Sequence, residues 1–227
     1  KCEAIGYPLL VKSSAGGGGI GMSVVQNFKD LASAIEKTSN LAAKSFGNGD
    51  IFIEKFITNA RHIEIQVFGF GAKGSVHLFE RDCSMQRRYQ KIIEESPAPE
   101  VDRELINNMA QAAVKLSSDV KYEGAGTVEF IYDVQEMKYY FLEMNTRIQV
   151  EHPVTELVTN NDLISMQINF AFNRKNKFLN QNKIKTYGHS IECRVYAEDP
   201  SQNFLPSPGK INKLKFPKIP NGIRLDW

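Results

Sequence analysis

The segment from Glu143 to Glu151 places side chains able to do chemistry at every second position. It reads EMNTRIQVE, so the alternating residues are Glu143, Asn145, Arg147, Gln149 and Glu151. On a β-strand, which has a side-chain period of two, all five side chains lie on one face. A solvated strand face has the same period, but it does not need Asn and Gln, which are poor strand formers. The pattern therefore favours a polar site over a solvated face.

Glu143 and Asn145 are spaced to reach one metal ion together with phosphates. Two residues apart on a strand, they are separated by about 6.6 Å, because each residue rises about 3.3 Å. Glu129, on the neighbouring predicted strand, supplies a second carboxylate. Oxygen ligands suit a hard cation, and magnesium usually combines one or two protein carboxylates with substrate phosphates. The sequence thus predicts a metal and phosphate site at Glu129, Glu143 and Asn145.

Glu151 is too far from Glu143 to serve the same reaction centre on a straight strand. The two residues would be about 26 Å apart at the same rise per residue. We therefore expect the chain to bend after Arg147. The bend would bring Arg147, Gln149 and Glu151 around an anion beside the metal, with arginine as a planar fork of donors and glutamate as a base.

A glycine-rich loop, 16–21, lies between two predicted strands. Gly16, Gly18 and Gly21 satisfy the dinucleotide fingerprint G-x-G-x-x-G, but that motif must open a helix, and strand-like residues 22–25 follow here. A P-loop also fails, because Met22 and Ser23 stand where Lys and Ser or Thr are needed. Two interpretations remain: a mobile linker, or a lid whose bare backbone N–H groups close over phosphates near Lys12.

Two further runs, 61–66 and 80–91, are dense in polar groups. In the first, His62, Glu64 and Gln66 share a predicted strand face, although a lone histidine is more often structural. The second is typical of an exposed loop with local ion pairs. Its Gln86 and Lys91 gain a functional interpretation only if the protein handles phosphates.

Composition narrows the class of protein. The 227 residues carry 28 Lys+Arg and 26 Asp+Glu, a net charge of +2, which argues against a nucleic-acid binder held by bulk charge. No apolar run approaches the roughly 18 to 20 residues that span a bilayer. Cys2, Cys83 and Cys193 are too far apart for a metal or disulfide framework, which favours a reducing compartment, the cytoplasm or mitochondrial matrix. The first residues do not resemble a signal peptide, and both ends look cut.

Periodicity predicts a chain of mixed helices and strands. The expected helices are 28–46, 105–116 and 163–172; the expected strands are 7–12, 22–25, 51–53, 63–67, 76–79, 126–133 and 138–145, with a further strand region at 189–197. Asn27 is the expected N-cap of the first helix, and Gly47 ends it. The basic segment 173–183 is interpreted as a solvated linker rather than a binding patch, because aromatic interleaving is almost absent.

Taken together, several motifs resemble the biotin carboxylase family of ATP-grasp enzymes. They are Val11-Lys12 with the glycine loop, Phe52–Lys55, Ala60–Gln66, Glu80–Lys91, Gly126–Phe130, Glu143–Glu156 and Glu192–Arg194. The match runs through essentially the whole chain in order, and ERDCSMQRR followed by EMNTRIQVEHPVTE is highly specific. The resemblance implies an α+β ATP-grasp fold with a glycine-rich lid at 1–56, a central subdomain at 57–185 and the start of a C-terminal domain at 186–227.

The resemblance also implies an activity, a ligase that carboxylates carrier-bound biotin with bicarbonate and ATP through carboxyphosphate. The implied ATP-binding residues are Lys12, Gly18, Gly19, Met22, Glu54, Lys55, Phe56, Ile57, His62, Gln86, Tyr89, Glu129 and Glu143. The implied catalytic residues are Arg147, Glu151, Lys91 and Arg194. The residues implied to bind bicarbonate or biotin are Lys91, Arg147, Gln149, Val150 and Arg194. The implied ligands of Mg²⁺ or Mn²⁺ are Glu129, Glu143 and Asn145.

Departures from the family pattern leave alternatives open. Ile20 and Ser23 replace frequent basic residues, which weakens lid–phosphate attraction, and Tyr89 stands where His or Asn is common. Similarity to urea carboxylases is found at Ile20 and in segments 121–133 and 225–227. Similarity to acyl-CoA carboxylase components is found in segments 188–194 and 204–209. A non-catalytic ATP-binding module is the alternative from another class.

The implied partners are a biotin carboxyl carrier protein or domain, a carboxyltransferase component and a second copy of the chain, with no nucleic acid or membrane. The leading expectation is the biotin carboxylase part of an acyl-CoA carboxylase, with the same half-reaction in urea carboxylase as the alternative. The acceptor itself stays open among acetyl-CoA, propionyl-CoA, methylcrotonyl-CoA, pyruvate and urea. We expect the 227-residue chain to be inactive without the family's flanking regions.

Overall fold

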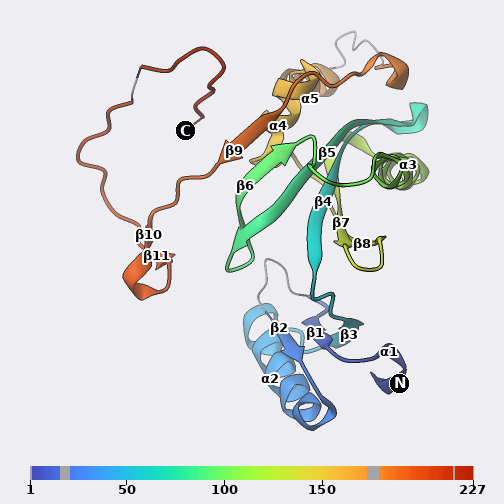
Figure 1. Ribbon diagram of the computed structural model, residues 1–227, viewed down its shortest axis with the longest axis vertical. Helices are drawn as coiled ribbons and strands as arrows, with labels where there is room; N and C mark the ends of the chain where they lie inside the picture. The colour runs from blue at the N-terminus through green and yellow to red at the C-terminus, as the bar shows by residue number, and fades with distance from the viewer. Residues whose placement is uncertain (1, 16–20, 173–178, 217, 227) are drawn as a thin grey trace. The chain divides into compact units, whose positions relative to one another are not determined.

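The computed structural model describes residues 2–15, 21–172, 179–216 and 218–226. Its contacts divide the chain into two compact units, Lys1–Cys193 and Arg194–Trp227. Within the described residues no helix has the length and apolar character needed to cross a membrane. The first unit holds two antiparallel sheets and the second a two-stranded ribbon (Figure 1). Each unit is described below by itself.

A small three-stranded sheet forms the N-terminal part of the first unit. Its strands are β1 (Leu9–Ser13), β2 (Met22–Val25) and β3 (Ile51–Lys55), in the order β2-β1-β3, and a short helix, α1 (Cys2–Ile5), precedes them. Helix α2 (Phe28–Phe46) packs Leu31 onto Leu9, Val11 and Val25. Asn27 accepts a hydrogen bond from the backbone of Lys29, and Gly47 ends the helix with a φ of 73°, as the sequence predicts.

The large sheet has six strands, and every neighbouring pair is antiparallel. Its order is β8-β7-β4-β5-β6-β9, with β4 (Ala60–Phe70), β5 (Ser75–Arg87), β6 (Gln90–Ser96), β7 (Glu123–Asp133), β8 (Lys138–Asn145) and β9 (Ser190–Cys193). The 3₁₀ turn Gly71–Lys73 joins β4 to β5. Helices α3 (Arg103–Asp119), α4 (His152–Thr159) and α5 (Leu163–Ala171) complete this part.

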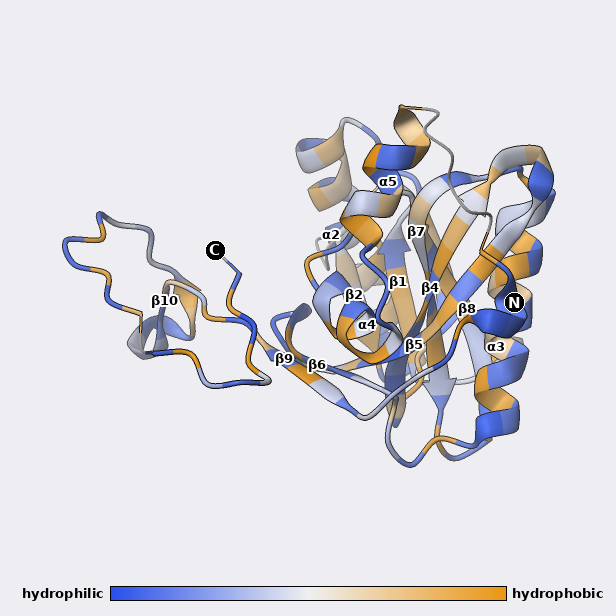
Figure 2. Ribbon diagram, turned by 90° about the horizontal axis from the view of Figure 1, so that it is seen from above, coloured by the Kyte–Doolittle hydropathy of each residue, from blue (hydrophilic) through white to orange (hydrophobic). Residues whose placement is uncertain are grey.

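Alternation along β4 decides which face of the large sheet carries chemistry. Ile63, Ile65 and Val67 are fully buried against α3, where they meet Met109 among other apolar side chains. Phe68 points to the opposite face, where it packs with Leu163 of α5. Because side chains alternate along a strand, His62, Glu64 and Gln66 share the face of Phe68, away from α3. Figure 2 shows hydrophobic and hydrophilic residues alternating along β4 and β5.

The second unit contains little regular structure among its described residues. Strands β10 (Glu198–Asp199) and β11 (Leu205–Pro206) pair in antiparallel fashion around the 3₁₀ turn Pro200–Gln202. Asp199 accepts hydrogen bonds from the Ser201 backbone and hydroxyl, at 2.9 and 2.7 Å, which stabilises this turn. The strand expected in the region 189–197 is shorter than predicted, because β9 pairs with β6 only as far as Cys193.

Two further expectations need correction. The run 80–91 is not an exposed loop, since its first eight residues continue the largely buried strand β5 and its end enters β6, which the sequence did not predict. The hairpin turn between them is Arg88 and Tyr89. The expected helices also do not include α4, in which Pro153 lies in the first turn, a position that proline tolerates.

The interpretation of 173–183 as a linker is tested only in part. Residues 173–178 lie outside the described part of the chain, and the 3₁₀ turn Gln181–Lys183 follows them. The turn is held to the sheet because the Gln181 side chain accepts a hydrogen bond from the His77 backbone N–H at 2.8 Å and donates one to the His77 carbonyl at 3.0 Å.

Candidate functional site

A charged cluster lies on the polar face of the large sheet, with Lys91 at its centre. The Nζ atom of Lys91, on β6, donates to Glu64 at 2.5 Å, Glu151 at 2.6 Å and Glu129 at 2.9 Å. These carboxylates come from β4, β7 and the turn before α4, and each is at most 4% exposed. Burial by itself lowers the pKa of Lys91, but the neighbouring negative charges, Glu64 first, outweigh it and raise the pKa.

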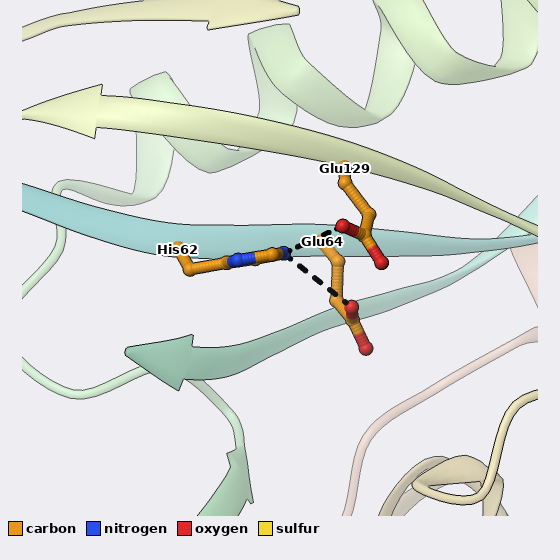
Figure 3. Close-up of side chains that lie close together, drawn as sticks. All are labelled: His62, Glu64 and Glu129. Atoms are coloured by element: carbon orange, nitrogen blue, oxygen red, sulfur yellow. Dashed lines mark ion pairs between the residues drawn. The ribbon is translucent and has the colours of Figure 1, made fainter. Parts of the chain in front are cut away.

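Glu129 receives three side-chain hydrogen bonds on one of its oxygens. Its Oε1 atom accepts from Lys91, Asn145 and Gln149, each at 2.9 Å. Its Oε2 atom lies 2.9 Å from Nε2 of His62, whose ring also lies 3.9 Å from Glu64, as Figure 3 shows. Burial raises the pKa of Glu129, but the adjacent His62 ring and the Lys91 ammonium group lower it to about 2. Glu129 is therefore an anion at neutral pH.

Arg81 is the largest fully buried side chain in the described part of the chain. It lies on β5 and donates from Nε to Glu64 Oε1 at 2.5 Å and from Nη2 to Gln149 at 3.1 Å. Burial raises the pKa of Glu64, but the charges of Arg81 and Lys91 outweigh it and lower the pKa. The fully buried Arg81 and the partly buried Lys91 thus face three buried carboxylates, so the charges of the cluster are largely compensated within the protein.

Glu143 and Glu129 are direct cross-strand partners on β8 and β7, so their side chains lie on the same face. The Asn145 amide nitrogen lies 2.9 Å from Glu129 Oε1 and 3.2 Å from Glu143 Oε1. Two carboxylates and an amide thus surround one point, and a rotated amide would add its oxygen to an all-oxygen donor set. This donor set fits Mg²⁺ or Mn²⁺. A second group within metal-binding distance comprises His62, Glu64 and Glu129.

The bend that brings Glu151 to the site is present, as the sequence predicts. Strand β8 ends at Asn145, and Glu151 is the residue immediately before α4. Between them Gln149 is buried, whereas Val150 is 60% exposed. Arg147 is exposed at the bend and donates to the Ile148 carbonyl at 3.2 Å and to the Asn145 side chain at 3.5 Å. The turn therefore places an arginine beside the predicted metal ligands.

His62 and Gln86 are brought together, whereas Tyr89 is not. The Gln86 Nε2 atom lies 3.0 Å from His62 Nδ1 and donates to the Cys83 carbonyl at 2.9 Å. Tyr89 is 64% exposed at the hairpin, with a φ of 63°. Cys83 is buried next to Glu64 and Glu151, and burial raises the pKa of its thiol well above the usual value, so it stays protonated.

The expected lid residues lie on the small sheet. Lys12, on β1, forms an ion pair with Glu54 of β3 at 3.0 Å and lies 5.2 Å from the centre of the Phe52 ring. Met22 is the first residue of β2. Lys55 is the last residue of β3 and forms an ion pair with Glu136 at 2.9 Å, and Phe56 and Ile57 follow β3 in the chain. Gly18 and Gly19 lie outside the described residues. Strand β2 directly follows the loop, which excludes a Rossmann motif.

Arg194 belongs to the second unit, where it donates to the Tyr196 hydroxyl at 3.3 Å. Its place relative to the cluster is therefore not described. The sequence analysis did not assign Arg81 or Glu64 to the site. The signal that would have found Glu64 is its position on the same strand face as His62 and Gln66. No comparable signal marks Arg81, because its role depends on contacts from four separate elements.

Comparisons with known proteins identify the family of the chain. Residues 1–178 match the family model of the carbamoyl-phosphate synthase L chain, ATP-binding domain, and residues 192–227 match that of the biotin carboxylase C-terminal domain. The chain is 52% identical over 222 residues to biotin carboxylase 1 of Bacillus subtilis (strain 168). That alignment covers 98% of this chain and 49% of the relative, so the chain spans about half the relative's length.

Two solved structures are similar over nearly the whole chain. One is a biotin carboxylase–β-γ-ATP complex from Campylobacter jejuni, with a TM-score of 0.89, 49% identity and coverage of 97% of this chain and 48% of that one. The other is the biotin carboxylase domain dimer of Hydrogenobacter thermophilus 2-oxoglutarate carboxylase with MgADP, ADP and bicarbonate. It has a TM-score of 0.89, 45% identity and coverage of 96% and 48%.

Proposed function

From the premise that this chain belongs to the biotin carboxylase family and has its ATP-grasp fold, we propose that the protein carboxylates carrier-bound biotin, using bicarbonate and ATP. The observation that carries the proposal is the contact of Lys91 with Glu151 and Glu129. This contact supports the proposal because it joins the proposed base, a cation and the predicted metal ligand, the groups that activation of a small anion beside a phosphate requires.

The first half of the reaction joins bicarbonate to the γ-phosphoryl group of ATP. Bicarbonate is bound by Lys91, Arg147, Gln149 and the backbone near Val150. Glu151 removes the proton of bicarbonate. The resulting oxygen attacks the γ-phosphorus, the bond to the β-phosphate oxygen breaks, and ADP and carboxyphosphate form. The cations neutralise the charge that develops on the phosphoryl oxygens, which is where such reactions gain most.

Nucleotide and metal binding are assigned to two groups of residues. Lys12 and the glycine loop hold phosphates, Glu54 to Ile57 form the adenine-side hinge, and His62, Gln86 and Tyr89 line the nucleotide site. Glu129, Glu143 and Asn145 would hold Mg²⁺ or Mn²⁺, which supplies positive charge to the phosphates when bound. The cross-strand pairing of Glu129 and Glu143 supports this assignment.

The second half transfers carbon dioxide to biotin. Carboxyphosphate releases carbon dioxide beside the biotin ring, and the phosphate that leaves takes the N1′ proton. The enolate form of biotin then attacks carbon dioxide, so that a carbon–nitrogen bond forms. Arg194 stabilises the enolate, and Arg147 stabilises the anionic intermediates by charge-assisted hydrogen bonds.

The same proposal extends to organisation and partners. Residues 1–56 form the lid, 57–185 the central subdomain and 186–227 the start of the C-terminal domain. The partners are a biotin carboxyl carrier, a carboxyltransferase and a second copy of the protein. The acceptor is an acyl-CoA, with urea as the alternative.

The common part of the proposal is tested with the full-length protein, free biotin, bicarbonate and MgATP. We expect ADP release that depends on both biotin and bicarbonate. Nucleotide binding without bicarbonate-dependent phosphate release would instead identify a non-catalytic ATP-binding module. A screen with acetyl-CoA, propionyl-CoA, methylcrotonyl-CoA, pyruvate and urea then identifies the acceptor.

A further inference from the structure

The guanidinium of Arg81 uses all of its hydrogen-bonding capacity inside the protein. It donates from Nε to Glu64 at 2.5 Å, from Nη1 to Gln66 at 2.6 Å and Thr155 at 2.9 Å, and from Nη2 to Thr127 and Gln149, both at 3.1 Å. A guanidinium has five N–H donors and no acceptor. Each of the five partners must therefore turn an oxygen toward Arg81, and this requirement reaches side chains on two strands, one helix and the bend.

The requirement fixes the orientation of the Gln149 amide. Its oxygen accepts from Arg81 at 3.1 Å, so its nitrogen must face the other way, where it donates to Glu129 at 2.9 Å. A reversed amide would direct N–H groups at the donors of Arg81 and an oxygen at the Glu129 carboxylate. Both contacts would be repulsive in a buried environment, where an unpaired polar group is costly. Arg81 thus determines that Gln149 presents a donor to the site.

Arg81 also divides the two oxygens of Glu64 between the two cations. Oε1 of Glu64 accepts from Arg81, and Oε2 accepts from Lys91 at 2.5 Å. Lys91 in turn reaches Glu151 at 2.6 Å. The guanidinium of Arg81 is therefore connected to Lys91 through Glu64, and to Glu151 through Glu64 and Lys91. On its other side it is connected to Glu129 through Gln149.

We propose that Arg81 is a positioning residue that holds the Gln149 amide with its NH₂ end toward the site, where that group binds bicarbonate. This inference rests on the proposed function, because it assigns the orientation of a bicarbonate ligand. Among the described residues the Gln149 Nε2 atom has one acceptor, Glu129. An amide NH₂ carries two N–H groups, so the second one serves a bicarbonate oxygen. A purely structural ion pair would stabilise the fold without affecting bicarbonate selectively.

The first test is the variant Arg81→Lys of the full-length protein, which replaces the guanidinium group and its five donors by a single ammonium group. We expect the KM for bicarbonate to rise about tenfold or more, the effect of losing one hydrogen bond to a charged group, while the KM for MgATP changes less than about twofold. Arg103→Lys is the matched control, because Arg103 forms an ion pair of 2.6 Å with the buried carboxylate of Glu80, and neither residue belongs to the cluster. The control should leave both constants unchanged. Equal changes in both constants for Arg81→Lys would overturn the proposal.

The second test asks whether Arg81 acts through Gln149. The bicarbonate KM of the double variant Arg81→Lys/Gln149→Ala should match that of Gln149→Ala alone, because the two residues serve one contact. If the two single effects multiply, Arg81 acts independently and the proposal is wrong.

A third variant, Gln149→Glu, decides the question if Arg81→Lys does not fold. It keeps an oxygen on Arg81 but presents a second oxygen instead of a donor to Glu129, so the bicarbonate KM should rise while the MgATP KM does not. An unchanged bicarbonate KM would overturn the proposal. A wild-type protein without bicarbonate-dependent ATP cleavage would reject the proposed function itself, whereas an active wild type with normal variants rejects only the role of Arg81.

Discussion

The Nζ atom of Lys91 lies 2.6 Å from Oε1 of Glu151, so the proposed base and the proposed anion-binding cation form an ion pair. The two residues are 60 positions apart, one on β6 and one at the turn before α4. At this distance in a buried environment the attraction is far stronger than in water. The proposed base and the proposed anion-binding cation are therefore in direct contact, although they are far apart in the sequence.

We expect Glu151→Gln to lower kcat about 100-fold or more, because an amide still accepts a hydrogen bond from Lys91 but cannot take a proton. MgATP binding should stay within about twofold of wild type. Steady-state ADP release and calorimetric titration of the full-length protein measure the two quantities. Glu95→Gln is the control, since Glu95 pairs with His189 at 2.9 Å outside the cluster and should be active. A fully active Glu151→Gln would contradict the assignment of the base.

Metal binding can be tested without turnover. We expect Glu143→Gln to weaken Mn²⁺ binding in the presence of ADP about tenfold, because one of two carboxylate ligands becomes neutral. Electron paramagnetic resonance of free Mn²⁺ measures this directly. Glu136→Gln is the matched control, because Glu136 lies at the turn between β7 and β8 and pairs with Lys55 and Lys138 instead. Equal affinities in the two variants would show that Glu143 is not a ligand.

The pH dependence of stability follows from Glu129, whose pKa falls from 4.5 to about 2 on folding. A lowered carboxyl pKa stabilises the folded state above pH 4.5, and that stabilisation is lost as the pH falls from 4.5 toward 2. The shift corresponds to on the order of 3 kcal/mol. Wild type should thus be more stable than Glu129→Gln near pH 7, with a difference that shrinks below pH 4.5.

Denaturant unfolding of both full-length proteins between pH 3 and 7 measures this difference. Glu36→Gln, an exposed position on α2, serves as the control and should follow the wild-type curve. A stability difference that does not vary with pH would show that the charge of Glu129 is not the cause.

Strand periodicity was enough to predict most of the polar face. His62 and Glu64 alternate with buried isoleucines, and the distance argument for Glu143 and Glu151 correctly required a bend. These features follow from the local geometry of a strand, which the spacing of residues in the sequence is enough to predict. The burial of the 80–91 run was not predicted, because its charges look solvated until their partners are known. Arg81 in particular is buried only because β4, β7, α4 and the bend together supply five oxygens.

Lys12 provides a test of the lid. It pairs with Glu54 at 3.0 Å, so an incoming phosphate must compete with that carboxylate for the ammonium group. We expect Lys12→Met to raise the KM for MgATP about tenfold, because a point charge on the phosphates is lost, while the KM for bicarbonate stays nearly constant. Lys29→Met, which removes an exposed lysine at the start of α2, is the matched control and should change neither constant. Steady-state kinetics of the full-length variants separate the two constants, and a rise confined to bicarbonate would place Lys12 at the other substrate.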